Sequence, residues 1–299
     1  MVQLDGRTSA DLYAARVEAV EAQRTRLRGP RPPGDLFAAL PPDHPLLSSD
    51  PRRPLDPNLE VLAAYLEPSD AVVDVGGGSG RISLPLALRC REVINVEPSA
   101  AMAAAFAANA ARADIANVRA VAADWPAAEP PQGTVALVNH VTYFVRDIVP
   151  FIEQLEQAGP RRVIITVNSP PPPSWNRRLY QLVHGEAEEV VPGHVELVNV
   201  LWDQGILPDI HVLPVPPPGA AMPAPSRDAA VAGAVARFGG DQWAFWPLGP
   251  ELERRLRELL EARFDELFAS GGGGYIPRWV TPGRELLITW RPGADRQAS

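Results

Sequence analysis

The segment Val72-Val73-Asp74-Val75-Gly76-Gly77-Gly78-Ser79-Gly80-Arg81 decides the fold of this 299-residue chain. Its first residues are apolar and β-branched, which predicts a buried strand. A helical pattern follows from Arg81 to Leu88, so the glycines stand at a strand-to-helix turn. Glycines in such a turn let a ligand lie against the backbone, and the helix start offers free N–H groups and a positive dipole end.

The spacing of the glycines narrows the class of ligand. A dinucleotide-binding turn has the pattern Gly-x-Gly-x-x-Gly, but counting from Gly76 puts Arg81 at the third glycine position. The pattern present is an acid, one residue and three alternating glycines: Asp74, Gly76, Gly78 and Gly80. It resembles motif I of the class I S-adenosylmethionine-dependent methyltransferases. The resemblance implies that the glycines lie under the methionine part of the cofactor and that Asp74 contacts its amino group, directly or through water.

Polar residues also follow the next three predicted strands. Glu97 follows the strand at 93–96, and Asp124 and Trp125 follow the strand at 118–122. Asn139 ends the strand at 134–139. The resemblance implies that Glu97 accepts the ribose hydroxyls, that Asp124 accepts the adenine amino group, and that Trp125 lies against the adenine ring. It also implies that Asn139 meets the amino end of the cofactor. Since ligands of open α/β sheets bind at the carboxyl ends of the strands, all four strand ends point to one site.

His140 and Tyr143 are the candidate catalytic residues. They follow the fourth strand, where the methyl group of the cofactor points in this family. A histidine suits proton removal at neutral pH, because its ordinary pKa is about 6.5. A second interpretation is open for each residue: His140 as a helix cap or pocket wall without chemistry, and Tyr143 as a core side chain.

Helical and apolar β-branched segments alternate from residue 58 to residue 168, which predicts a parallel sheet covered on both faces. The resemblance implies an α/β, Rossmann-like, doubly wound sheet of seven strands in the methyltransferase order, with the last strand antiparallel. We expect an N-terminal helix and a proline-rich strap in residues 1–57. The methyltransferase domain would then span residues 58–299, with helical cap segments at about 170–206 and 216–283.

Several local predictions complete this picture. The N-terminal helix should span Thr8 to Leu27 with a capping box from Thr8 and Asp11, and one hypothesis makes it a lid over the cofactor. We expect a helix from Pro250 to Ala269, a flexible Gly271 to Gly274, and a closing strand from Glu285 to Trp290. The aromatic residues of the cap could form a cage for a flat or cationic substrate, or fill a helical core; they are Trp175, Trp202, Trp243, Phe245 and Trp246.

The composition excludes several functions. The net charge of −8 opposes binding to a phosphate backbone, and no apolar run reaches the roughly 20 residues of a membrane span. All 28 basic residues are Arg, which excludes Schiff-base and P-loop lysine chemistry. The single cysteine, Cys90, excludes an internal disulfide and favours the cytoplasm. No histidine or carboxylate spacing indicates a metal site.

The predicted function is therefore transfer of a methyl group from S-adenosylmethionine to a small-molecule acceptor, with S-adenosylhomocysteine as product. The protein would act as a monomer or homodimer. Three alternatives stay open: a catalytically silent cofactor-binding protein with this fold, a nicotinamide-dependent oxidoreductase, and a protein methyltransferase.

Overall fold

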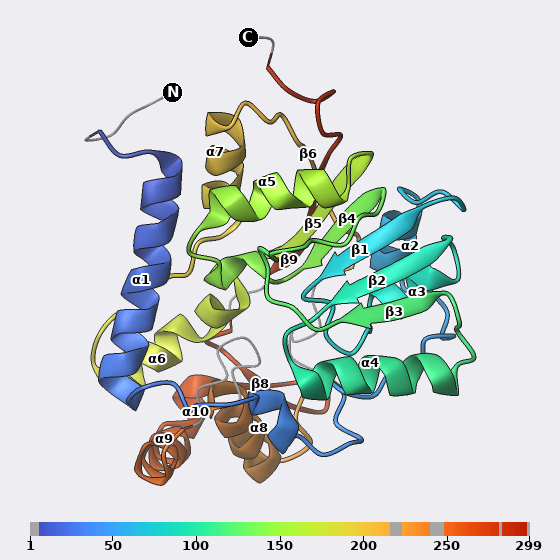
Figure 1. Ribbon diagram of the computed structural model, residues 1–299. Coiled ribbons are helices and arrows are strands. Elements are labelled where there is room, and N and C mark those ends of the chain that lie inside the picture. Colours follow the sequence, from blue (N-terminus) through green and yellow to red (C-terminus); the bar gives the residue numbers. More distant parts are fainter. Residues whose placement is uncertain (1–5, 216–222, 240–247, 281–282, 298–299) are drawn as a thin grey trace.

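The computed structural model describes residues 6–215, 223–239, 248–280 and 283–297 (Figure 1). Its main sheet contains β1 (Ala71–Val75), β2 (Glu92–Val96), β3 (Val118–Val121), β4 (Val135–Asn139), β5 (Arg162–Ser169), β6 (Asp209–Val212) and β9 (Arg284–Trp290). The strand order is β3-β2-β1-β4-β5-β9-β6. The five strands β3, β2, β1, β4 and β5 run parallel to one another. β9 runs antiparallel to both β5 and β6. The predicted seven-stranded sheet with an antiparallel last strand is confirmed.

Helices cover both faces of the sheet. One face carries α1 (Ser9–Arg28), α5 (Ile148–Ala158) and α7 (His194–Asp203), and the other carries α2 (Pro57–Ala63), α3 (Ser83–Ala87) and α4 (Ala100–Arg112). Alternate residues of β1 belong to different clusters: Val73 and Val75 pack with the first set of helices, and Val72 packs with the second. This two-sided burial explains why the strands are continuously apolar in sequence. Within the described residues, none of the helices combines the length and the apolarity of a membrane span.

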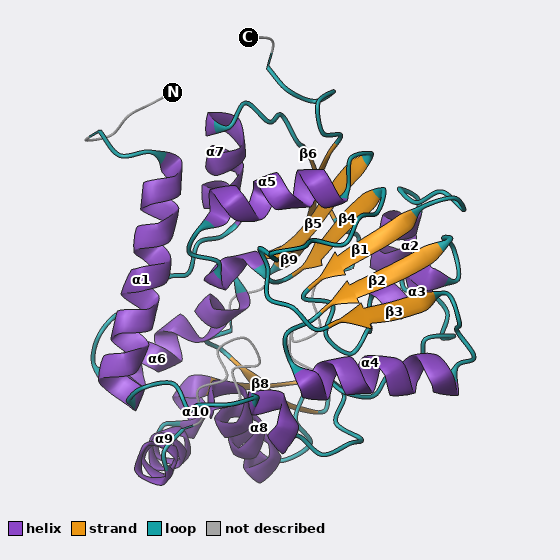
Figure 2. Cartoon of the chain, viewed as in Figure 1, coloured by secondary structure: helices purple, strands orange, loops and turns teal. Residues whose placement is uncertain are grey.

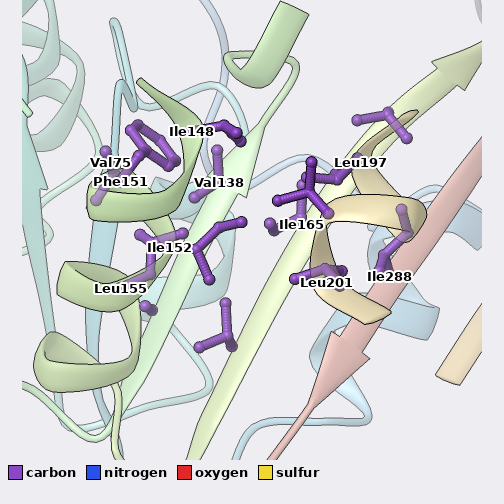
Figure 3. Close-up of a cluster of buried hydrophobic side chains, with 14 of the residues drawn as sticks. Val75, Val138, Ile148, Phe151, Ile152, Leu155, Ile165, Leu197, Leu201 and Ile288 are labelled. Atoms are coloured by element: carbon purple, nitrogen blue, oxygen red, sulfur yellow. The ribbon is translucent and has the colours of Figure 1, made fainter. Parts of the chain in front are cut away.

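The cluster under α5 and α7 fixes these helices on the sheet. Figure 3 shows their apolar side chains against those of four strands, namely Ile148, Phe151, Ile152, Leu155, Leu197 and Leu201 over Val75, Val138, Ile165 and Ile288. Complete burial stabilises each side chain by about 1.5–3 kcal/mol relative to water. α7 lies within the first predicted cap segment but packs on the sheet. The proposed division into domains stays a prediction.

The N-terminal helix begins as the sequence predicts. Thr8 is its N-cap and forms a capping box with Asp11. Tyr13, Val17 and Val20 are buried in the same cluster as α5 and α7. Because opening this helix would expose all three side chains to water, the packing argues against a helix that opens and closes as a lid.

The proline-rich strap contains one short 3-10 helix, η1 (Leu36–Ala39). Hydrogen bonds from the domain reach its backbone carbonyls: Ser79 Oγ donates to Leu46, and Asn109 Nδ2 donates to Leu47. The Asp35 carboxylate accepts from Ser99 Oγ and from the backbone N–H of Ala101 at the start of α4. The strap is thus attached to the glycine-rich turn itself, through Ser79.

A separate cap lies beyond the carboxyl ends of the strands. The arrowheads of β1, β2 and β3 point toward the side of the molecule that holds α6 (Arg177–His184) and α8 (Arg227–Gly239) (Figure 2). α9 (Pro250–Ala262) and α10 (Phe264–Leu267) pack with them in a cluster that includes Leu179, Val231 and Leu256. This cluster has its own aromatic centre, made of Phe264, Phe268, Tyr275 and Trp279.

One prediction for the cap is wrong. The helix expected from Pro250 to Ala269 ends earlier, because Phe268 and Ala269 begin β7 (Phe268–Gly271), which pairs with β8 (Gly274–Pro277). The segment Gly271 to Gly274 contains the turn of this hairpin, and its flexibility stays a prediction. Gly272 and Gly273 have φ values of +59° and +81°, as a tight hairpin turn with two left-handed residues requires.

Candidate functional site

The glycine-rich turn is built from backbone conformations and distances that only glycine tolerates. Gly76, Gly78 and Gly80 all have positive φ, between +57° and +79°. A Cβ atom on Gly76 would lie 2.6 Å from Val141 Cγ2, and one on Gly80 would lie 2.5 Å from Phe106 Cδ2. The turn therefore brings α3 and α4 close to the sheet and leaves backbone exposed toward a ligand.

Asp74 lies beneath this turn with an unsatisfied carboxylate. Its residue is 1% exposed, and neither carboxyl oxygen has a hydrogen-bond partner among the described residues. Burial raises the pKa of Asp74 to about 7, and the charge of Glu97 adds to the rise. The Ser83 hydroxyl lies nearby and lowers the pKa in part, but its geometry is not that of a hydrogen bond. A buried carboxylate without a partner is unfavourable for folding, which points to a ligand that would complete it.

Glu97 is fixed by two backbone N–H groups. Gly78 N donates to Glu97 Oε2 at 2.9 Å, and Ser99 N donates to Oε1 at 2.9 Å. Burial raises the pKa of Glu97 above its ordinary value despite these two bonds. Each oxygen retains a further lone pair, so the carboxylate can accept two more hydrogen bonds without moving.

Asp124 and Trp125 lie in the loop that follows β3. Asp124 is exposed, whereas Trp125 is half-buried and donates from Nε1 to the Phe151 carbonyl oxygen at 3.3 Å. This bond attaches the loop to α5. The structure places both residues after the third strand, as expected, but shows no contact that joins Asp124 to Asp74 or Glu97.

Asn139, the last residue of β4, has a hydrogen-bond partner for its side-chain oxygen but none for its side-chain nitrogen among the described residues. Its Oδ1 accepts from Thr166 Oγ1 at 2.7 Å, whereas its Nδ2 is buried without a partner among the described residues. β4 lies next to β1, and Leu137 pairs with Asp74. Since side chains two apart on a strand share a face, Asn139 and Asp74 lie on the same face of the sheet at its carboxyl edge.

His140 adopts a positive φ of +58°, which is uncommon for a residue with a side chain. Its backbone N–H donates to Thr166 O, and its ring lies between Tyr143 and Glu285. Nδ1 is 3.2 Å from Tyr143 Oη, and Nε2 is 3.0 Å from Glu285 Oε1. The structure thus brings the two candidate catalytic residues together and adds a carboxylate.

Tyr143 is fully buried in the short 3-10 helix η2 (Thr142–Phe144). Its Oη accepts a hydrogen bond from Asn168 N at 2.5 Å, and burial raises the pKa of its hydroxyl. Tyr13 Oη of α1 donates to the Thr142 carbonyl at 2.7 Å. The turn that carries His140 and Tyr143 is therefore attached to both β5 and α1.

Two functional residues were not predicted from the sequence. Gly77 counts only as a spacer in the motif, yet a Cβ atom there would lie 2.1 Å from Asp74 Oδ2 and 2.5 Å from Asn95 Oδ1. Glu285 was recognised only as the start of a strand. The signal for Glu285 was its place at the beginning of an antiparallel strand, which puts it at the carboxyl edge of its parallel neighbours.

Of the five aromatic candidates of the cap, the structure describes two. Trp202 is exposed on α7, and Trp175 donates from Nε1 to the Pro170 carbonyl at 2.9 Å. Trp243, Phe245 and Trp246 lie outside the described residues. In the described ranges, no group of three or more His, Cys, Asp and Glu side chains could hold a metal ion.

Comparisons with known proteins agree with this arrangement. Residues 72–157 match the family model described as a methyltransferase domain. The YcgJ protein from Bacillus subtilis aligns with a TM-score of 0.51 and 14% identity, over 79% of this chain and 99% of that one. A methyltransferase from Thiobacillus denitrificans, solved with S-adenosyl-L-homocysteine, aligns with a TM-score of 0.48 and 14% identity, over 86% of this chain and 97% of that one.

A magnesium protoporphyrin IX methyltransferase from Synechocystis, also solved with bound S-adenosylhomocysteine, aligns with a TM-score of 0.44 and 17% identity, over 52% of this chain and 75% of that one. No curated protein sequence matches this chain. The match over 72–157 includes the glycine-rich turn and the ends of β1, β2, β3 and β4. Residues 72–157 thus match a methyltransferase domain, and the chain has the fold of the class I S-adenosylmethionine-dependent methyltransferases.

Proposed function

We propose that this protein uses S-adenosylmethionine to methylate a small-molecule acceptor. The observation that carries the proposal is the buried, unpartnered carboxylate of Asp74 beneath the glycine-rich turn, beside the fixed carboxylate of Glu97. A nucleoside with ribose hydroxyls and a positively charged tail supplies donors and charge to these acceptors. The pyrophosphate of a nicotinamide dinucleotide would instead bring negative charge toward two carboxylates.

In this proposal, the residues of the turn and of the strand ends hold the cofactor. Asp74 complements the ammonium group, directly or through water, and Glu97 accepts the ribose hydroxyls. Asp124 receives the adenine amino group, Trp125 lies against the adenine ring, and Asn139 faces the amino end. The bound cofactor supplies an electrophilic methyl group. The protein then aligns the acceptor and excludes water from the site.

His140 is the proposed general base, required when the acceptor arrives protonated. Its side chain is 11% exposed, at the carboxyl edge of β4. Tyr143 is 0% exposed, so we propose that it orients His140 and does not itself touch the acceptor. The net charge of −8 and the cap over the strand ends favour a small molecule over a nucleic acid. We further propose that the protein is cytoplasmic, because its single cysteine is buried and free. A monomer or homodimer stays our expectation for its oligomeric state.

Calorimetry with S-adenosylhomocysteine and with reduced nicotinamide dinucleotide tests cofactor identity. We expect heat of binding only with S-adenosylhomocysteine. Heat of binding only with the dinucleotide would favour an oxidoreductase. Incubation with methyl-labelled cofactor and a metabolite pool then tests turnover. Binding without any transferred label would favour the catalytically silent alternative, and label found only in polypeptide would favour a protein methyltransferase.

A Glu97→Ala variant should bind S-adenosylhomocysteine more weakly by roughly 1.5–3 kcal/mol, about ten- to a hundredfold, because it loses charge-assisted bonds to the ligand. The matched control is Glu92→Ala, on the same strand but facing Arg119 at the opposite end. Its affinity should equal that of the parent protein. Equal affinity in both variants would overturn the placement of the ribose at Glu97.

A further inference from the structure

The imidazole of His140 is held at both nitrogens by residues distant in sequence. Tyr143 Oη lies 3.2 Å from Nδ1, and Glu285 Oε1 lies 3.0 Å from Nε2. Glu285 is the second residue of β9, and because β9 is antiparallel, its start lies at the carboxyl edge beside the end of β5. Asn168 of β5 pairs with Glu285 across this edge. The histidine, the tyrosine and the carboxylate therefore meet where the proposed acceptor would bind.

The hydrogen positions follow from the partners. Asn168 N–H donates to Tyr143 Oη, so the tyrosine hydroxyl can direct its own hydrogen at His140 Nδ1. Nδ1 then carries a lone pair, and the ring hydrogen sits on Nε2. A carboxylate accepts hydrogen bonds only, which agrees with an Nε2–H group directed at Glu285. The three groups are thus consistent with a single tautomer of His140.

A second layer of contacts fixes Glu285. Asn58 Nδ2 donates to Glu285 Oε2 at 2.7 Å, and the same amide bonds both backbone groups of Val215. Burial alone would raise the pKa of Glu285, but the bonds from His140 and Asn58 and the charge of Arg81 outweigh it and hold that pKa below its ordinary value. Glu285 is therefore ionised at neutral pH.

We infer that Glu285 is a positioning residue that holds the His140 ring in one orientation and in the Nε2–H tautomer. The inference rests on the proposed function, in which His140 lies beside the acceptor. Among the described residues, Glu285 from β9 and Tyr143 from η2 contact this imidazole, and Arg81 lies near the carboxylate. A carboxylate at this position can only accept a hydrogen bond from Nε2–H, whereas the amide of a glutamine could also donate to an Nε2 atom without a hydrogen.

NMR of protein labelled with ¹⁵N-histidine tests this role without any acceptor. The chain has five histidines, and a His140→Gln spectrum identifies the signals of interest. In the parent protein at high pH, Nε2 should carry the hydrogen and Nδ1 should not. In Glu285→Gln, which keeps the shape but adds an amide donor, the Nδ1–H tautomer of His140 should become populated at high pH.

The control is Glu156→Gln, which removes a carboxylate that bonds Trp290 at the other end of β9. It should leave the tautomer of His140 unchanged. An unchanged tautomer in Glu285→Gln, or an Nδ1–H tautomer in the parent protein, would overturn the inference. The second outcome does not depend on Glu285→Gln, so the test holds even if that variant fails to fold. Binding of S-adenosylhomocysteine is scored separately, which distinguishes failure of this role from failure of the proposed function.

Discussion

An Asp74→Asn variant should be more stable than the parent protein at pH 8 and yet bind S-adenosylhomocysteine more weakly. Burial raises the pKa of Asp74 to about 7 in the folded protein, against 3.8 for an ordinary aspartate. Between these two pH values the folded protein holds a proton that the unfolded chain has released. Stability therefore falls as the pH rises through this window, by roughly 4 kcal/mol in total.

Asparagine cannot ionise, so the variant avoids this loss. The free energy of unfolding of the variant, relative to the parent, should increase from pH 5 to pH 8 in denaturant titrations at each pH. Loss of the charge opposite the ammonium group should weaken binding at pH 8 by roughly 1.5–3 kcal/mol, measured by calorimetry. Affinity of the parent protein for the same ligand should rise with pH through about 7, as Asp74 ionises.

Asp70 provides the matched control for this variant. It precedes the same strand, is also 1% exposed, and lies at the opposite edge of the sheet. Its carboxylate bonds Arg161 and Thr134, and these contacts outweigh the effect of burial and lower the pKa of Asp70. Asp70→Asn should destabilise the protein at pH 8 and leave ligand affinity unchanged. A loss of stability at pH 8 in Asp74→Asn as well would contradict the proposed burial of an uncompensated charge.

A Gly77→Ala variant should be destabilised by roughly 1–3 kcal/mol and should lose affinity for S-adenosylhomocysteine. The added methyl group would lie 2.1 Å from Asp74 Oδ2 and 2.5 Å from Asn95 Oδ1, so either the turn or the carboxylate must move. Asn95 Nδ2 donates to the Gly78 carbonyl, which ties the turn to β2 and opposes that movement. Thermal unfolding and calorimetry measure the two effects.

Gly233→Ala is the control for the glycine substitution. Gly233 lies within α8, and nothing stands within 4 Å of the position where its Cβ would be. Alanine there should stabilise the protein by about 0.4–1 kcal/mol by restricting the unfolded chain. Parent-like affinity and stability in Gly77→Ala would show that the turn adapts, and would remove Gly77 from the site.

The sheet could be predicted because its signals are local. The apolar residues that begin the glycine-rich segment lie in a buried strand, β1, as predicted, and the strand ends at Glu97 and Asn139 lie at the carboxyl edge as expected. A run of buried β-branched residues and a glycine turn can each be recognised from a stretch of about ten residues. The right-handed crossover of parallel strands then fixes which edge they share.

The partners of the site residues could not be predicted, because they come from distant segments. The contact between His140 and Glu285 joins β4 to a strand that begins 145 residues later, after the whole cap. Tyr13 reaches Thr142 from the N-terminal helix in the same way. In the cap, Phe268 continues the helical apolar pattern, but pairing with Pro277 draws it into a hairpin. Tertiary contacts decide such cases over local propensity.

The cap has an apolar centre of its own, which shares no buried residue with the two clusters on the faces of the sheet. Substitutions in contact couple energetically, whereas distant ones add independently. Changes around Leu179, Val231 and Leu256 can therefore accumulate with little penalty to β1 and its glycine-rich turn. Evolution can remodel the cap toward new chemistry while β1 and its glycine-rich turn stay as they are.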